Sequence, residues 1–365
     1  MSKTLVIILA ETRAYELTFD KFKKNVIDEL NADLCLCIGV KLDYNYDNPF
    51  YKLAKYKFLY NEPDDFAEAF DYAYDLLKKN INKYERIENF VKTVKCYGSY
   101  DTENELNLDD FDDDQIIIKK NYLPDKSCKT QVYGINRIEN DKNNEKIITY
   151  KKSLHWREFL KIKNQIMGGI KDKYNQHHGS AGILIFFRWF LLKNVIDNDL
   201  LSKYDRFVIT RSDFIFQLPH PKIESLNKNY IWIPDGEDYG GYTDRHAILS
   251  KNNIISYLNI LTNFVLKSND YFLKMNEKCD WNLEKLIKFN LEQNNIFIVK
   301  KIPYIMYSVR NIDGPTRYCE GVFSEDLGYF IKYRKEFNAS NYYRNLFETS
   351  SMTICDFYKE YIDTS

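Results

Sequence analysis

The chain has 365 residues, of which 44% are hydrophobic and 29% charged, values that are typical of a globular protein with a substantial core. Its 52 basic and 53 acidic side chains give a formal net charge of -1, so no overall positive field exists to hold a nucleic-acid backbone. Nucleic acid is therefore not expected as the main partner. The 30 tyrosines and 24 phenylalanines predict an aromatic-rich core.

Two apolar stretches bear on membrane association. Residues 182–196 are shorter than a membrane span and contain Arg188 and Lys193, which predicts a buried helix. The run 5–10 is too short for a signal peptide and is predicted to be the first strand. Apart from Cys35-x-Cys37 in a predicted strand, no pair of the seven scattered cysteines has the spacing of a zinc site, which is typical of reduced thiols. These features predict a cytoplasmic protein without a membrane span.

Strands and helices are predicted to alternate in the first third of the chain. Apolar runs at 5–10, 34–40 and 56–60 predict strands. A helix between the first two is indicated by apolar residues at spacings of three and four: Phe19, Phe22, Val26, Ile27 and Leu30. Pro63 opens a second helix. Such alternation is typical of a sheet with helices on both faces, so the predicted fold class is α/β with a mostly parallel central sheet.

The middle of the chain departs from this pattern. Residues 97–152 include an acidic run at 109–114 and few apolar residues. They are predicted to be an insertion within a single domain spanning 1–365, with the acidic run as a solvated loop. A helix capped by Ser153 and an apolar helix over 183–196 come next.

Ser180 lies in a turn of small residues directly before the apolar helix. It either caps that helix or, with free backbone donors of the helix terminus, binds a phosphate or a sugar hydroxyl, and the sequence leaves both interpretations open. The remaining elements are predicted as strands at 207–210, 230–233 and 296–300, an extended segment at 303–309, helices at 252–265 and after Asp280, and an aromatic extension over 323–365 whose helices pack on the sheet.

Two of these segments carry the candidate site. Residues 207–213 are predicted to be a buried strand that delivers Asp213 at its carboxyl end, and residues 232–245 a strand that opens into an acidic, glycine-rich loop. Ligands of open α/β sheets bind beyond the carboxyl ends of the strands. We therefore expect Asp213 and the loop to face each other across one cleft that holds a diphosphate.

The segment Thr210-Arg211-Ser212-Asp213, followed by Gly240-Gly241-x-x-Asp244-Arg245, resembles glycosyltransferases with the GT-A fold. In those enzymes an Asp-x-Asp motif ends a central strand and holds a metal ion and the diphosphate. The chain also resembles a group of such enzymes from giant viruses and capsule-forming bacteria, over residues 1–95 and 155–315. The resemblance implies a Rossmann-like GT-A domain that transfers a sugar from a UDP- or GDP-linked donor to a surface polysaccharide or virion glycan, in the host cytoplasm if the protein is viral.

The resemblance implies that Asp213 holds the metal, Mn²⁺ or Mg²⁺. Arg211 stands where the first acid of the motif would be. One carboxylate with water and phosphate oxygens can still hold a hard cation, whereas Arg211 can instead bind the diphosphate directly and make the metal unnecessary. Both alternatives stay open, as does a structural ion pair between the two residues.

The acidic loop supplies the candidates for acid–base chemistry. Four acids and three glycines lie within residues 235–245, and repulsion among the acids would raise at least one pKa, which suits a proton acceptor. By similarity to GT-A enzymes, an acid of this loop is the base if the reaction inverts the anomeric centre. Asp244 is the first candidate and Glu237 the second. An exposed acidic turn is the alternative.

Four further residues are candidates for binding the donor. Arg13, just beyond the first strand, can reach a phosphate or a base edge, and Asp43, just beyond the second, can accept hydrogen bonds from a ribose. Arg245 follows the candidate base, and Arg310, at the end of a late strand, can close over the diphosphate as a bidentate donor. Each can instead be a surface charge or part of a structural ion pair.

Two other functions are compatible with the sequence. The first is nucleotidyl or phosphoryl transfer on the same sheet, although no Walker loop or Gly-x-Gly-x-x-Gly follows the first strand, where Glu11-Thr12-Arg13 stands. The second is a noncatalytic carbohydrate-binding protein whose tyrosines and tryptophans stack on sugars.

Overall fold

The structure is a computed structural model. It describes residues 3–79, 155–157, 168–174, 176–177, 179–268, 271, 281–296, 298–314 and 320–364, together with the backbone of three strands between 116 and 150. The acidic run, most of the predicted insertion and most of the predicted helix that begins at Ser153 lie outside these residues.

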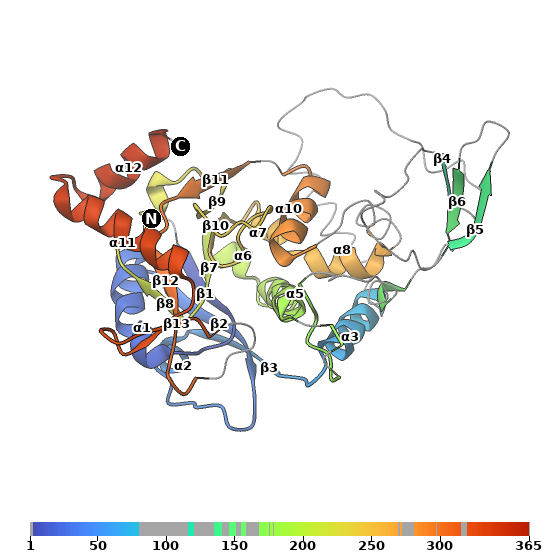
Figure 1. Cartoon of the computed structure of the whole chain (residues 1–365), viewed down its shortest axis with the longest axis horizontal. Helices are drawn as coiled ribbons and strands as arrows, with labels where there is room; N and C mark the ends of the chain where they lie inside the picture. The colour runs from blue at the N-terminus through green and yellow to red at the C-terminus, as the bar shows by residue number, and fades with distance from the viewer. Residues whose placement is uncertain are drawn as a thin grey trace.

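The centre of the molecule is a seven-stranded sheet with the order β11-β9-β10-β7-β1-β2-β3 (Figure 1). Neighbouring strands run parallel except at β10, which is antiparallel to both of its neighbours. The prediction of an α/β fold with a mostly parallel sheet is therefore confirmed. The strands are β1 (Thr4–Ala10), β2 (Asp33–Val40), β3 (Tyr56–Asn61), β7 (Arg206–Thr210), β9 (Ile231–Pro234), β10 (Ala247–Ser250) and β11 (Val299–Ile302).

Strand β1 lies between β2 and β7, and its residues from Thr4 to Leu9 are buried. Because successive side chains of a strand point to opposite faces, Leu5 and Ile7 join one hydrophobic core and Val6 and Ile8 another. The continuous apolar run is the pattern of a strand that is covered on both faces.

Helices of the central part of the chain cover one face of the sheet (Figure 1). The apolar helix α5 lies in the middle of this layer and contacts β1, β2 and its neighbouring helices. In the part of the chain that the structure describes, no helix has both the length and the apolar character needed to cross a bilayer. The layer consists of α3 (Phe66–Lys79), α5 (Ala181–Asp197), α7 (Ile254–Leu258), α8 (Ile260–Leu266) and α10 (Leu283–Gln293), with the short α6 (Leu200–Lys203) following α5.

The other face is covered by helices from both ends of the chain and by a second sheet with the order β13-β14-β12-β8. Strand β8 follows β7 after only three residues, so the two sheets meet at Asp213. The elements are α1 (Tyr15–Phe22), which continues as a π-helix over Lys23–Asp28, α2 (Pro49–Leu53), β8 (Phe214–Phe216), a 3₁₀ turn at Ile223–Ser225, and β12 (Met306–Arg310).

The carboxyl-terminal extension begins with a hairpin, where only helices were predicted. Strands β13 (Val322–Ser324) and β14 (Tyr329–Ile331) pair with each other, and β14 pairs with β12. Helices α11 (Arg334–Thr349) and α12 (Ile354–Thr364) follow. The Tyr358 hydroxyl of α12 donates a hydrogen bond to the Pro219 carbonyl at 2.6 Å, which ties the extension to the core.

Within the predicted insertion, the described residues form three antiparallel strands with the order β4-β6-β5. They are β4 (Ile116–Lys119), β5 (Ile135–Asn140) and β6 (Lys146–Tyr150).

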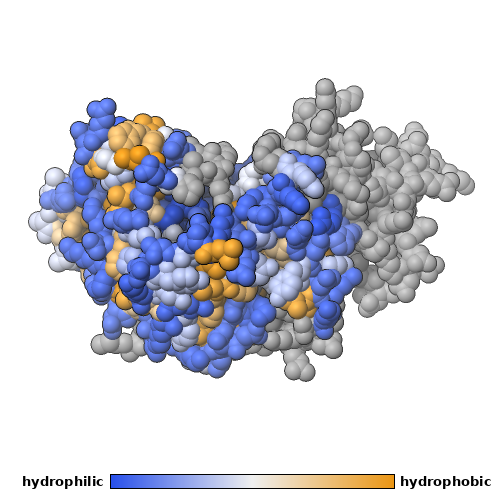
Figure 2. Space-filling model, turned by 90° about the horizontal axis from the view of Figure 1, so that it is seen from below, coloured by the Kyte–Doolittle hydropathy of each residue, from blue (hydrophilic) through white to orange (hydrophobic). Residues whose placement is uncertain are grey.

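On the face drawn in Figure 2, hydrophilic residues predominate and apolar residues gather in small, separate areas. The exposed apolar side chains of the hairpin and of α11 include Val322, Phe323 and Tyr342.

Candidate functional site

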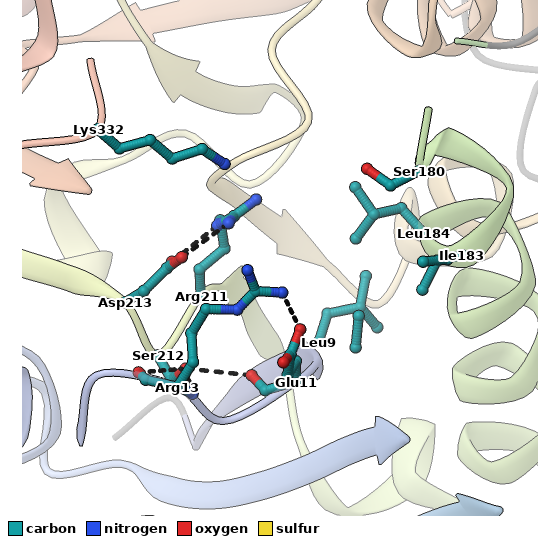
Figure 3. A pocket seen from close by; sticks show the side chains of 11 residues that line it. Leu9, Glu11, Arg13, Ser180, Ile183, Leu184, Arg211, Ser212, Asp213 and Lys332 are labelled. Atoms are coloured by element: carbon teal, nitrogen blue, oxygen red, sulfur yellow. Dashed lines mark hydrogen bonds and ion pairs between the residues drawn. The ribbon is translucent and has the colours of Figure 1, made fainter. Parts of the chain in front are cut away.

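The candidate site is a cavity beyond the carboxyl ends of β1 and β7. The chain adds β2 and β3 on one side of β1 and then returns to place β7 on its other side, so the strand order reverses between β1 and β7. Crevices at such a reversal are where open α/β sheets bind ligands. The residues that line the cavity are Leu9, Ala10, Glu11, Arg13, Ser180, Ile183, Leu184, Arg211, Ser212, Asp213 and Lys332 (Figure 3).

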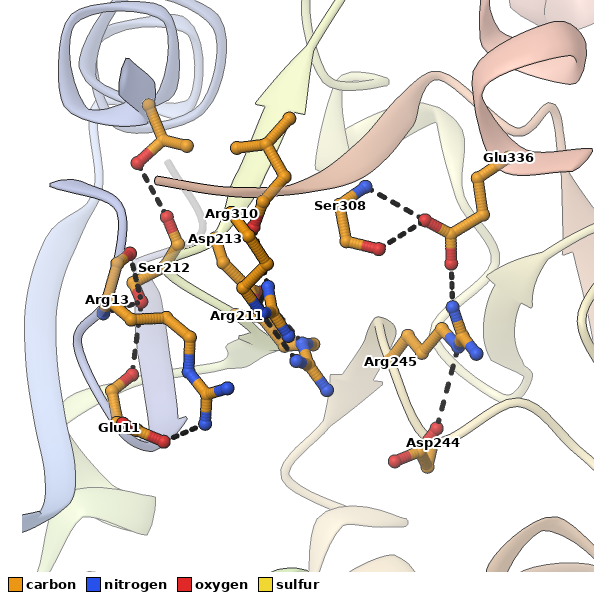
Figure 4. Close-up of polar contacts among 12 residues, drawn as sticks. Glu11, Arg13, Arg211, Ser212, Asp213, Asp244, Arg245, Ser308, Arg310 and Glu336 are labelled. Atoms are coloured by element: carbon orange, nitrogen blue, oxygen red, sulfur yellow. Dashed lines mark hydrogen bonds and ion pairs between the residues drawn. The ribbon is translucent and has the colours of Figure 1, made fainter. Parts of the chain in front are cut away.

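Ser212 ties the loop after β1 to the loop after β7. Its hydroxyl accepts a hydrogen bond from the Arg13 amide at 2.9 Å and donates to the Glu11 carbonyl at 3.1 Å (Figure 4). The Ser212 carbonyl accepts from the Thr18 hydroxyl of α1 at 2.7 Å. Ala10 and Ala14 have positive φ angles of 74° and 53°, a backbone conformation that costs about 1–3 kcal/mol per residue unless the surroundings hold it.

Asp213 is buried between two arginines. Arg211 donates to both of its carboxylate oxygens at 2.8 Å, and Arg310 donates to Oδ2 (Figure 4). The Asp213 carbonyl accepts from the Val309 amide at 2.9 Å, which brings the end of β12 to this position. Burial alone would raise the pKa of Asp213, but the charges of Arg211 and Arg310 hold that pKa well below its usual range. The ion pair that the sequence left as one alternative is thus present, as part of a three-residue cluster.

Lys332 completes the cationic side of the cavity and was not a candidate from the sequence. It follows β14 directly, and its amide donates to the Ser308 carbonyl of β12 at 2.9 Å. Its side chain extends toward Arg211 (Figure 3). Burial, together with the charges of Arg211 and Arg310, lowers the pKa of Lys332 to about 6.

Ser180 lies on the opposite wall, beside the apolar side chains of Ile183 and Leu184 (Figure 3). Its side chain makes no capping hydrogen bond to α5. The first amides of the helix are also occupied, because Ala181 and Gly182 donate to the carbonyls of residues 168 and 169 at 3.4 and 2.9 Å. The expectation of free backbone donors at this helix terminus is therefore wrong, and the Ser180 hydroxyl is what faces the cavity.

Arg245 joins the acidic loop to α11. Its guanidinium pairs with the buried Glu336 (Figure 4). It also approaches Glu237 at 3.5 Å and lies 4.0 Å from the centre of the Tyr333 ring. Glu336 also accepts from the Ser308 amide at 2.8 Å and from the Tyr304 hydroxyl at 3.0 Å. Arg245 was predicted to bind the donor, but its ion pairs hold the loop against α11. Glu237 forms an ion pair with Arg245 and accepts a hydrogen bond from the Tyr239 hydroxyl.

A second carboxylate lies near Asp244, from outside the predicted loop. Burial and the charge of Asp244 raise the pKa of Glu284, in the first turn of α10, to about 7. Arg188 of α5, fully buried, donates to the Asp244 carbonyl at 3.3 Å. Crowding of acids was expected to raise the pKa of a loop carboxylate, but the carboxylate with the raised pKa is Glu284 of α10. The loop acid Asp238 instead forms an ion pair with Lys301 at 2.5 Å.

Arg211 links the two halves of the site. Burial opposes its charged form, but the carboxylates of Asp213 and Asp244 raise its pKa. Asp244 is therefore within electrostatic range of the arginine that binds Asp213, and Figure 4 shows both groups facing the same space. Asp43, in contrast, is exposed in the turn after β2 and does not line the cavity.

The donor set around Asp213 does not fit a divalent cation. Both carboxylate oxygens are occupied by guanidinium groups, and no cluster of three or more His, Cys, Asp or Glu side chains suited to a metal is found among the described residues. Hard cations need several oxygen ligands, whereas this site presents N–H donors. The arrangement suits an anion with several oxygens.

No protein-family model matches the chain, and no curated protein is significantly similar to it.

Proposed function

We propose that this protein is a glycosyltransferase with a GT-A-like domain, which moves a sugar from a UDP- or GDP-linked donor to a glycan acceptor. One observation carries the proposal: the cavity at the strand-order reversal gathers more positive than negative side chains. Four cations and two carboxylates meet at or beside it, namely Arg13, Arg211, Arg310 and Lys332 against Glu11 and Asp213. With Lys332 protonated, this is an excess of two positive charges.

A nucleoside diphosphate carries the negative charge that would balance this excess. When the bond between the anomeric carbon and the diphosphate oxygen breaks, negative charge builds on the leaving diphosphate. Guanidinium groups stabilise phosphate oxygens through paired, charge-assisted hydrogen bonds. The wall opposite the arginines is formed by the apolar side chains of Leu9, Ile183 and Leu184 together with the Ser180 hydroxyl. This hydroxyl can form a hydrogen bond with a hydroxyl group of the donor sugar.

The acceptor side of the proposed reaction uses the carboxylates near Arg211. The acceptor hydroxyl oxygen bonds to the anomeric carbon, and its proton passes to a carboxylate. We assign this role to Asp244 because its charge acts on Arg211 of the cavity. Glu284 lies beside it, with a pKa that burial and the charge of Asp244 raise to about 7. Glu237 is the weaker candidate because Arg245 and Tyr239 already engage it.

The proposal is tested by incubating the protein with UDP- and GDP-sugars and a panel of glycan acceptors, with and without Mn²⁺, while nucleoside diphosphate release and product mass are followed. We expect acceptor-dependent release of one nucleoside diphosphate. Asp244→Asn should lower kcat more than it weakens donor binding. Cleavage of nucleoside triphosphates without sugar transfer would favour nucleotidyl or phosphoryl transfer, and glycan binding without nucleotide binding would favour a noncatalytic protein.

A further inference from the structure

Asp213 has a different set of partners from the one its position in the motif implies. Its two oxygens are occupied by Arg211, and Arg310 shares Oδ2 (Figure 4). Its side chain is 2% exposed. A carboxylate in this state has little capacity left for a cation, and both guanidiniums would repel one.

The positive charges around the cavity also disfavour the binding of a cation. Burial and the charges of Arg211 and Arg310 disfavour the charged form of Lys332, so a further positive charge in this space is already unfavourable. A divalent ion would meet the same two arginines with twice the charge. An anion, in contrast, would relieve the repulsion and restore the proton on Lys332.

Arg310 supplies an independent observation, which is that hydrogen-bond acceptors are missing beside the cavity among the described residues. It is 1% exposed, and within the described part of the chain its Nε and Nη2 atoms have no hydrogen-bond partner. Arg310 and Arg211 thus share one carboxylate, although buried cations are usually fully paired.

We propose that the cavity binds the donor diphosphate through its own cationic side chains, without a divalent cation, and that Asp213 is the positioning residue that holds Arg211 and Arg310 for it. This inference rests on the proposed function for the identity of the ligand. The anion site itself is argued from the two arginines that share Asp213 and from the nitrogen atoms of Arg310 that lack a partner in the described part of the molecule.

The test is isothermal titration calorimetry with inorganic pyrophosphate, UDP and GDP, in EDTA and then in Mn²⁺, alongside titration with Mn²⁺ alone. We expect pyrophosphate and one nucleoside diphosphate to bind in EDTA, with Kd within threefold of the value in Mn²⁺, and Mn²⁺ alone to give no heat of binding. Arg211→Ala should weaken binding about 10- to 100-fold, because it removes a charged hydrogen-bond donor. Lys228→Ala, an exposed cation away from the cavity, is the matched control and should leave Kd unchanged.

Asp213→Asn separates the two roles of Asp213. As a positioning counter-ion, its loss leaves the buried Arg310 and the partly exposed Arg211 without their carboxylate, so the free protein should melt at a lower temperature and pyrophosphate in EDTA should raise Tm more than in the wild type. As a metal ligand, its loss would abolish binding in Mn²⁺. If Asp213→Asn fails to fold, Arg211→Lys, which keeps the charge but loses the paired geometry, takes its place and should show weaker metal-free binding.

Failure of this inference and failure of the proposed function give different results. Binding of anions only in Mn²⁺, or no pyrophosphate binding in EDTA, overturns the inference even if sugar transfer is observed. Metal-free pyrophosphate binding without binding of any nucleoside diphosphate or nucleotide sugar supports the anion site and refutes the transferase.

Discussion

The side chain of Lys332 enters a cavity that already holds Arg211, and burial together with the charges of Arg211 and Arg310 lowers its pKa to about 6. At pH 7 the free protein therefore keeps this lysine largely neutral. A bound diphosphate would raise the pKa of Lys332, so binding takes up a proton between pH 6 and the higher pKa of the complex. By linkage, affinity falls as the pH rises through this window.

We expect calorimetry at pH 7, in buffers of different ionisation enthalpy, to show uptake of close to one proton per bound UDP or GDP. Lys332→Met should remove most of this uptake and flatten the dependence of Kd on pH above 6. Equal proton uptake in the wild type and in Lys332→Met would show that Lys332 does not contact the anion.

Glu284 shows the opposite linkage, because its folded pKa of about 7 lies above the ordinary value of 4.5. Between these two values the folded state binds more protons than the unfolded one, so this group makes stability fall as the pH rises from 4.5 to 7. Glu284→Gln removes the contribution. We expect urea titrations at pH 8 to show Glu284→Gln about 1–3 kcal/mol more stable than the wild type, and the difference to vanish near pH 4.

Glu292→Gln, at the other end of the same helix, serves as the control for a simple change in charge. A stability difference for Glu284→Gln that does not change with pH would contradict the raised pKa. If Glu284 assists the proton acceptor, kcat of the wild type should also rise with pH and level off above about 7.

At the scale of elements, Glu336 connects three parts of the fold. It lies on α11, accepts from Ser308 of β12, and pairs with Arg245 of the acidic loop. Because the carboxylate is fully buried, its removal leaves Arg245 without its main counter-charge. We expect Glu336→Ala to lower the free energy of unfolding by about 3–5 kcal/mol, measured by urea denaturation.

Glu348 offers a matched control on the same helix, since its pair with Arg344 spans 3.9 Å at the surface. Glu348→Ala should cost about 0–1 kcal/mol. Equal losses for the two substitutions would mean that the buried contact of Glu336 contributes no more than a surface ion pair.

Some elements could be predicted from local sequence and others could not. Strands β1, β2 and β7 are continuous buried runs, and their predicted bounds lie close to the observed ones. Strand β10 is only four residues long and buried on both faces, so it shows no alternation. The hairpin β13–β14 was missed because its stability comes from pairing with β12.

The same division applies to the site. Arg13, Arg211 and Asp213 could be found because the carboxyl ends of neighbouring parallel strands meet at one edge. No motif near Lys332 or Glu284 in the sequence indicates that they lie at the site, because each is placed there by a contact with a distant residue. The Lys332 amide donates to the Ser308 carbonyl, and the Glu284 carbonyl accepts from the Tyr242 amide. Pairing across such separations cannot be read from a single sequence.

For the whole molecule, the two ends of the extension have separate roles. Residues 322–336 carry Lys332 and Glu336, whereas α12 contributes Phe357 and Tyr358 to the hydrophobic core on the face of the sheet opposite α5. Two buried aromatic side chains bury roughly 150–250 Å² each, which corresponds to several kcal/mol at about 25 cal/mol per Å². Helix α12 is therefore expected to support the fold without forming part of the anion site.

Deletion of residues 351–365 tests this division. The shortened chain keeps Lys332 and Glu336, so it should bind pyrophosphate with a Kd within about threefold of that of the full chain while its Tm falls by several degrees. Tyr358→Phe, which keeps the packing and loses only the hydrogen bond to Pro219, should lower stability by about 1 kcal/mol. A shortened chain that keeps the Tm of the full chain but no longer binds pyrophosphate would contradict this division. It would show that α12 forms part of the anion site and does not stabilise the fold.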